Sequence, residues 1–135
     1  MATIKCFEEV ESWKKARVVC KKIGELIDAG RFAKSYRLIN QIEGASGSVM
    51  DNIAEGFERG TRAEFIQFLG YSKGSCGELR SQLYRAADRS YINEGEFEEL
   101  KTAVVQISGL IQNLISYLQQ SGINGVRKKA TPKEL

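Results

Sequence analysis

Apolar residues recur every three or four positions along most of this chain, a spacing typical of helices with one buried face. Four such segments follow one another, near 8–28, about 33–57, 61–89 and 93–122. The single proline, Pro132, lies beyond all four segments, so their interiors contain no proline break. The residues predicted to face inward are Val10, Trp13, Ala16, Val19, Cys20, Ile23 and Ile27, then Leu38, Ile42, Ala45, Val49 and Ile53, then Phe65, Phe68, Leu69, Ser72, Cys76, Leu79, Leu83 and Ala86, and finally Phe97, Leu100, Val104, Ile107, Ile111, Leu114 and Leu118.

The ends of these segments carry capping signals. Thr61 followed by Glu64, and Asn93 followed by Glu96, have the spacing of capping boxes, in which two side chains satisfy free amides at a helix start. Gly122 is placed to cap the last helix in a left-handed conformation. Because the connections between segments are only a few residues long, neighbouring helices are expected to run antiparallel.

The chain is 135 residues long, the length of one domain. The pattern predicts an all-α fold, an up-down-up-down antiparallel four-helix bundle over residues 1–122. Residues 123–135 read as a basic, disordered tail. A chain of this size can bury a core without a disulfide or a metal.

The composition argues against several kinds of catalytic and metal-binding chemistry. The chain has no histidine, which removes the commonest general base and the commonest metal ligand. Cys6, Cys20 and Cys76 are widely spaced, which argues against zinc and against a disulfide framework and favours a reducing, cytoplasmic setting. Nothing in the sequence resembles a membrane span or a signal peptide. We therefore expect no cofactor, no metal and no enzymatic activity.

Glycines within the predicted helices need a packing reason, since each costs up to about 1 kcal/mol relative to alanine. Gly44, Gly47 and Gly56 interrupt the second segment. In the third segment a row of small residues, called here the glycine row, lies opposite the inward stripe and consists of Gly70, Gly74, Gly77 and Ser81. The glycine row is interpreted as a self-association surface, the alternatives being contact with another helix of the bundle or a tolerant solvated face.

A polar seam runs beside the apolar stripe of the second segment. It comprises Gln41, Ser48, Asn52 and Glu55, with Ser75 and Glu78 in a comparable position on the third segment. Paired carboxylates raise the alternatives of acid–base chemistry or a di-metal centre, but the bundle di-iron pattern requires Glu-x-x-His. We expect a structural seam, in which arginines or amides across the helix interface hold Glu55 and Glu78.

The net charge of +3 favours an anionic partner only weakly. Candidate phosphate contacts are Lys14, Arg17 and Lys21 on the first helix, Arg59 and Arg62 at the second turn, and Arg127, Lys128 and Lys129 in the tail. Binding through such contacts would be independent of sequence and would weaken with salt. The alternative is a charge-mixed, solvated face. Tyr71 and Tyr84 are the aromatic residues outside the core stripes that could stack on bases.

One motif resembles a known family. The run Asn52-Ile53-Ala54-Glu55-Gly56 is followed by Gly74-Ser75 and Glu78-Leu79. Together with Gln41-Ile42, Ala45, Ser48-Val49, Arg59, Glu64-Phe65, Phe68-Leu69 and Leu83, these residues resemble the bacterial four-helix-bundle proteins encoded in intervening sequences of 23S ribosomal RNA genes. A weaker resemblance extends over nearly the whole chain except the tail.

The resemblance implies a small cytoplasmic bundle that assembles into a homo-oligomeric ring, a pentamer in known relatives. Similar proteins include accessory proteins of diversity-generating retroelements, which bind nucleic acid and a reverse transcriptase through a basic surface. The family usually carries an arginine immediately before the alanine at position 45, where this chain has Gly44. If that arginine contacts phosphate or a buried glutamate in relatives, this chain has lost the contact, and Arg59 or Arg80 is expected to hold Glu55 instead.

The leading functional hypothesis is a non-enzymatic homo-oligomeric bundle that acts as an RNA- or DNA-associated adaptor. The alternative is a protein-interaction scaffold without nucleic-acid binding, whose partner would be a polymerase such as a reverse transcriptase. An enzyme is disfavoured because the chain lacks histidine, a reactive-cysteine setting and a phosphate-cradling loop. No small-molecule substrate is indicated.

Overall fold

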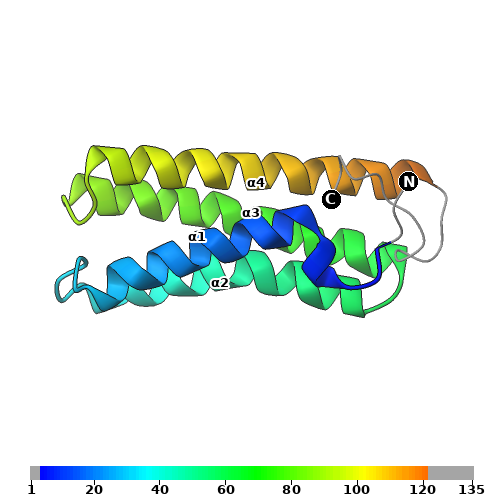
Figure 1. Cartoon of the computed structure of the whole chain (residues 1–135), viewed down its shortest axis with the longest axis horizontal. Coiled ribbons are helices and arrows are strands. Elements are labelled where there is room, and N and C mark those ends of the chain that lie inside the picture. Colours follow the sequence, from blue (N-terminus) through cyan, green and yellow to red (C-terminus); the bar gives the residue numbers. More distant parts are fainter. Residues whose placement is uncertain (1–3, 122–135) are drawn as a thin grey trace.

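The computed structural model describes residues 4–121 and consists of helices (Figure 1). A short 3₁₀ helix, η1 (Phe7–Glu9), precedes α1 (Glu11–Asp28), α2 (Tyr36–Glu58), α3 (Arg62–Asp88) and α4 (Glu94–Ser121). Over the described range there is no strand. The predicted all-α class is confirmed.

The four long helices form an antiparallel bundle. Helix α2 packs on α3, α3 on α4, and α1 on both α2 and α4, whereas α1 and α3 lie diagonally across the bundle. In Figure 1 the α1–α2 and α3–α4 connections lie at one end and the α2–α3 connection at the other. The up-down-up-down order therefore holds.

The core is built from the predicted stripes. All seven inward positions of α4, from Phe97 to Leu118, are buried. Trp13, Cys20, Ile27 and Phe68 are only partly buried, because they lie at the edges of their stripes. Buried apolar residues outside the predicted stripes include Phe57 on α2 and Ile115 on α4. Others come from turns and from the chain before α1, where they cover the bundle: Ile4, Phe32 and Ile92.

Two helices begin later than predicted. Val10 is extended (φ −72°, ψ 122°) and separates η1 from α1, so α1 starts at Glu11 rather than near residue 8. Ala33 has a left-handed φ of +50°, which ends the turn and delays α2 until Tyr36. Gly30 (φ +74°) and Gly60 (φ +85°) supply left-handed backbone in the two connections where the sequence placed them.

Both predicted N-caps form. At α4 the Asn93 Oδ1 accepts from the Glu96 amide (2.8 Å), and the Glu96 carboxylate accepts from the Asn93 amide (2.9 Å), which is a complete capping box. At α3 the Thr61 hydroxyl accepts from the Glu64 amide (3.2 Å) and donates to the Glu64 carboxylate (2.9 Å). The predicted cap at Gly122 and the predicted tail over 123–135 lie outside the described residues.

Glu96 also joins two connections of the bundle, because Arg31 donates to both of its carboxylate oxygens (2.6 and 2.9 Å). The Arg31 hydrogen bond and, second, the Asn93 amide lower the pKa of Glu96.

A lowered folded-state pKa of Glu96 stabilises the protein above the unfolded pKa of about 4.3, and this stabilisation is lost as pH falls through the folded pKa. We expect Glu96→Gln to be less stable than wild type near pH 7, with the difference shrinking below about pH 4.3. Urea unfolding of both proteins across pH 3–7 measures it, and a difference that grows in acid would contradict the assignment.

Candidate functional site

Of the three glycines within α2, only Gly56 has a packing reason. A Cβ added at Gly56 would lie 2.6 Å from the Cβ of Phe68 and 3.2 Å from Cδ1 of Phe65 on α3. At Gly44 and Gly47 the added Cβ would meet nothing within 4 Å. The expectation that all three glycines have packing roles in the bundle is therefore wrong for Gly44 and Gly47. Gly56 belongs to the close approach of α2 and α3.

The glycine row of α3 lies on the outer surface of the bundle. Its four residues are exposed, and a Cβ at Gly70, Gly74 or Gly77 would meet no atom within 4 Å. The alternative that another helix of the bundle packs on this row is wrong. Within the described chain the row leaves a smooth, uncovered strip on α3.

The polar seam forms local contacts rather than a connected site. Asn52 donates to the Ser48 carbonyl (2.9 Å), one turn earlier in α2. Glu55 accepts from Arg59 (3.0 Å) at the C-terminal end of the same helix. Arg59 is one of the two arginines expected for Glu55, but it does not come from across the helix interface. Glu78 is exposed and forms no ion pair with any residue of 4–121. The seam brings no pair of carboxylates together.

Three polar residues that the sequence pattern did not pair link α2 with α3. Arg85 donates to Gln41 Oε1 (2.8 Å), and the buried Ser72 hydroxyl donates to the Val49 carbonyl (2.6 Å). Ser72 already stood in the inward stripe, where a hydroxyl among apolar residues was the available signal.

Gln82 is also buried, at 7% exposure, and its Oε1 has no hydrogen-bond partner among the described residues.

Gln82 gives a direct stability prediction. A buried carbonyl oxygen without a partner carries a desolvation cost of about 1–3 kcal/mol. Gln82→Met keeps the length of the side chain and removes the polar atoms, so we expect the free energy of unfolding to rise by about 1–2 kcal/mol. Gln41→Met serves as the comparison, because that oxygen accepts from Arg85 and its loss should not stabilise. A fall in stability for Gln82→Met, measured by urea unfolding, would mean that the oxygen is satisfied.

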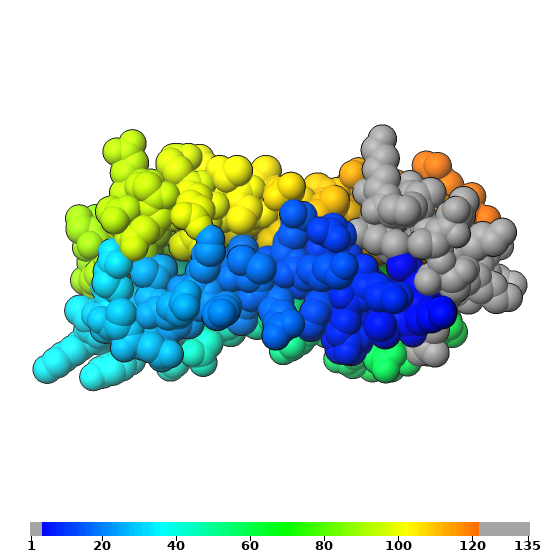
Figure 2. Space-filling view, in the orientation of Figure 1, coloured from blue at the N-terminus to red at the C-terminus, as the bar shows by residue number. Residues whose placement is uncertain are grey.

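The basic residues of α1 form one exposed face. Lys14, Arg17 and Lys21 are exposed, and their spacing places them on the side of the helix away from the core. Lys14 has only a long 3.9 Å contact with Glu11, and Arg17 lies 5.9 Å from the ring centroid of Trp13. Figure 2 shows α1 running across the front of the molecule, where this face meets solvent.

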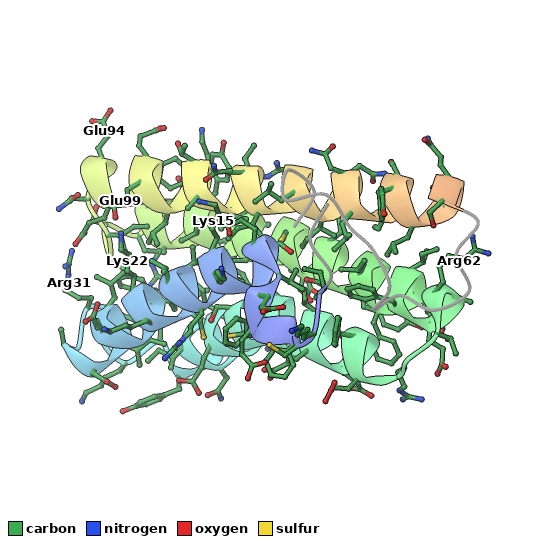
Figure 3. The ribbon with its side chains drawn as sticks, turned by 45° about the vertical axis from the view of Figure 1, so that its right-hand side comes forward. Lys15, Lys22, Arg31, Arg62, Glu94 and Glu99 are labelled. Carbon is green, nitrogen blue, oxygen red and sulfur yellow. The ribbon has the colours of Figure 1, made fainter. Side chains whose placement is uncertain are left out.

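The candidate arginines at the α2–α3 turn are already engaged. Arg59 bonds Glu55 (3.0 Å) and Glu64 (3.4 Å) and lies 5.0 Å from the ring of Phe68. Arg62 donates to the Leu118 carbonyl of α4 (3.4 Å) and lies at the far end of the bundle from Arg31 (Figure 3). Arg127, Lys128 and Lys129 lie outside the described residues. Tyr71 and Tyr84 are about half exposed, at 51% and 48%.

A groove between α1 and α4 holds two shallow cavities of about 240 and 210 Å³. Lys22 and Glu99 form an ion pair across the groove, and in Figure 3 their side chains point toward one another from the two helices. Val18, Leu100 and Ala103 supply apolar walls. Val18 is 53% exposed, so part of the groove is an apolar surface that nothing in the described chain covers.

The described residues show no reactive or metal-binding arrangement. Burial raises the pKa of the Cys76 thiol to about 11, against the opposing effect of Lys73 and Arg80, so this thiol is protonated and inert at neutral pH. Over residues 4–121 no three His, Cys, Asp or Glu side chains gather as a metal site. Within the same range no helix is both long and apolar enough to cross a bilayer.

Comparisons with known proteins agree with the fold. The crystal structure of a protein of unknown function from the S23 ribosomal protein family of Bacteroides thetaiotaomicron VPI-5482 matches with a TM-score of 0.58 and 22% identity, over 76% of this chain and 98% of that one. None of the curated proteins compared with the chain matches it. Residues 8–113 match the family described as 23S rRNA-intervening sequence protein. Because this match covers most of the sequence, the chain belongs to the 23S rRNA-intervening sequence protein family.

Proposed function

We propose that this chain is a non-enzymatic, self-associating four-helix bundle that acts as an RNA- or DNA-associated adaptor in the cytoplasm. The observation that carries the proposal is the uncovered glycine row of α3. Each glycine within a helix costs up to about 1 kcal/mol relative to alanine, and no atom of the described bundle comes near enough to require one at Gly70, Gly74 or Gly77. A second subunit whose backbone packs closely on this strip would give the three glycines a role. The pentameric ring expected from the family is one such assembly.

The exposed basic face of α1 supports the nucleic-acid part of the proposal. Arg17 and Lys21 form no ion pair with described residues, so their charges remain available to phosphates. Assembly would multiply this face by the number of subunits and so strengthen an otherwise weak contact with a long nucleic acid.

A protein-interaction scaffold remains the second candidate, because the α1–α4 groove has apolar walls and a half-exposed Val18. A helix of a partner protein that lays its apolar face along such a groove would be a familiar mode of recognition. This function needs no nucleic acid.

Light-scattering mass coupled to size exclusion, with the 260/280 nm absorbance ratio recorded over a salt series, tests both candidates. A mass several times 15.1 kDa together with nucleic acid that dissociates as salt rises is the result expected for the adaptor. An assembly free of nucleic acid even at low salt would favour the scaffold. A monomer would contradict self-association.

A further inference from the structure

A second set of cations lies on α3, along the flank that faces α4. Arg62, Lys73 and Arg80 are spaced by eleven and seven residues, which places them on one side of a helix with 3.6 residues per turn. One end of this row contacts α4, because Arg62 donates to the Leu118 carbonyl. One turn beyond the other end, Tyr84 packs on α4, with its ring centroid 4.8 Å from that of Phe97. We call these three cations the α3 basic row.

Two of the three cations of the α3 basic row are not neutralised by nearby acids. Lys73 and Arg80 are exposed and form no ion pair within residues 4–121. No Asp or Glu stands three or four positions from Lys73 or Arg80, so the usual helix-surface pairing is absent at these two cations. Glu78 lies on the opposite flank of α3.

Helix α4 adds no opposing charge beside most of this row. From Thr102 to Ser121 the helix contains no charged residue, whereas its four glutamates come earlier, between 94 and 99. Its exposed side chains here include Gln112 and Gln119, which can donate hydrogen bonds to phosphate oxygens. Arg62 uses one of its five N–H donors on Leu118, which leaves others available.

The α3 basic row is straight, and this shape suits a single strand of nucleic acid better than a duplex. From Arg62 to Arg80 it extends over about 27 Å along the helix axis, at about 1.5 Å per residue. A strand of duplex DNA winds through about three quarters of a turn over that length, since one turn rises about 34–36 Å. A duplex strand therefore leaves a straight row after a few phosphates, whereas a flexible single strand can follow all of it.

We propose that the α3–α4 face of this protein binds the phosphate backbone of single-stranded nucleic acid through Arg62, Lys73 and Arg80. The inference rests on the proposed adaptor function. It places the principal contact with nucleic acid on α3 instead of α1. The α3 basic row is rotated by about 80° around the helix from the glycine row, so one helix offers separate flanks to a second subunit and to a nucleic acid.

The test compares two double variants of the full chain that each remove one Arg and one Lys. Lys73→Gln/Arg80→Gln changes the α3 basic row, and Arg17→Gln/Lys21→Gln is the matched control on α1. The probe is a fluorescein-labelled 20-nucleotide oligo-dT, titrated by anisotropy between about 20 and 200 mM salt, with a 20-base-pair duplex as competitor. Circular dichroism and light-scattering mass check that each variant keeps the helix content and the mass of wild type.

Wild type is expected to bind the single strand more tightly than the duplex. Loss of two phosphate contacts should reduce the log–log salt slope of the α3 variant by about 1.4, which is about 25-fold weaker binding at about 0.1 M salt. The α1 variant should lose much less. An α3 variant that binds like wild type while the α1 variant loses affinity would overturn the inference and leave the adaptor function standing. Wild type that prefers the duplex would overturn it as well, and wild type without binding to either probe would refute both proposals.

Discussion

With the self-association proposed above, Gly74→Leu is expected to leave a monomer of about 15.1 kDa without loss of helix. Gly74 is exposed in the bundle, and a side chain there meets no atom within 4 Å. Leucine is also a better helix former than glycine by about 0.8–1 kcal/mol. The isolated bundle therefore tolerates the change, whereas a subunit packed on the glycine row would be displaced by a bulky side chain. Light-scattering mass and circular dichroism measure the two effects separately.

The matched control is Gly24→Leu on α1, the helix diagonally across from α3. Gly24 is also a helical glycine at which an added Cβ meets nothing within 4 Å. Its leucine variant should keep the mass of wild type. If Gly74→Leu assembled as wild type does, the glycine row would be a tolerant solvated face, and the self-association proposal would lose its structural basis.

Gly56→Ala is expected to destabilise the bundle by about 1–3 kcal/mol, the usual cost of overpacking a core. The new methyl group would stand 2.6 Å from Phe68 Cβ, an atom fixed by the backbone of α3 and unable to move by a simple rotation. Ser72 would be strained too, because its hydroxyl donates to Val49 across the same interface (2.6 Å). Urea unfolding monitored by helical circular dichroism gives the free-energy difference.

Gly44→Ala makes the same substitution in the same helix at an exposed position with no atom within 4 Å. It should stabilise the protein by about 0.5–1 kcal/mol through helix propensity. The two alanine variants are thus expected to shift stability in opposite directions. A gain in stability for Gly56→Ala would show that α2 and α3 do not approach as closely as the structure has them.

The fold could be predicted from sequence because it depends on local signals that repeat. Helical periodicity gave the number of helices and most of the core, and the caps at Thr61 and Asn93 gave the starts of α3 and α4 within a residue. The starts of α1 and α2 were missed because the extended Val10 and the left-handed Ala33 lie in otherwise helical patterns. Neither a valine nor an alanine within a helical pattern signals a break in the helix. The turns impose these conformations as they close over the core.

The sequence did not predict which residues of neighbouring helices contact one another. The sequence by itself determined the bundle, the position of the glycine row opposite the core stripe and the exposure of the α1 cations, because each follows from 3.6-residue periodicity along one helix. Only the tertiary structure decided that Gly56 is the close contact of α2 with α3, that Arg85 pairs with Gln41, and that no helix of the described bundle covers the glycine row. These facts depend on the distance and rotation between neighbouring helices, and a periodic pattern fixes the face of each helix but not which residue of its neighbour it meets.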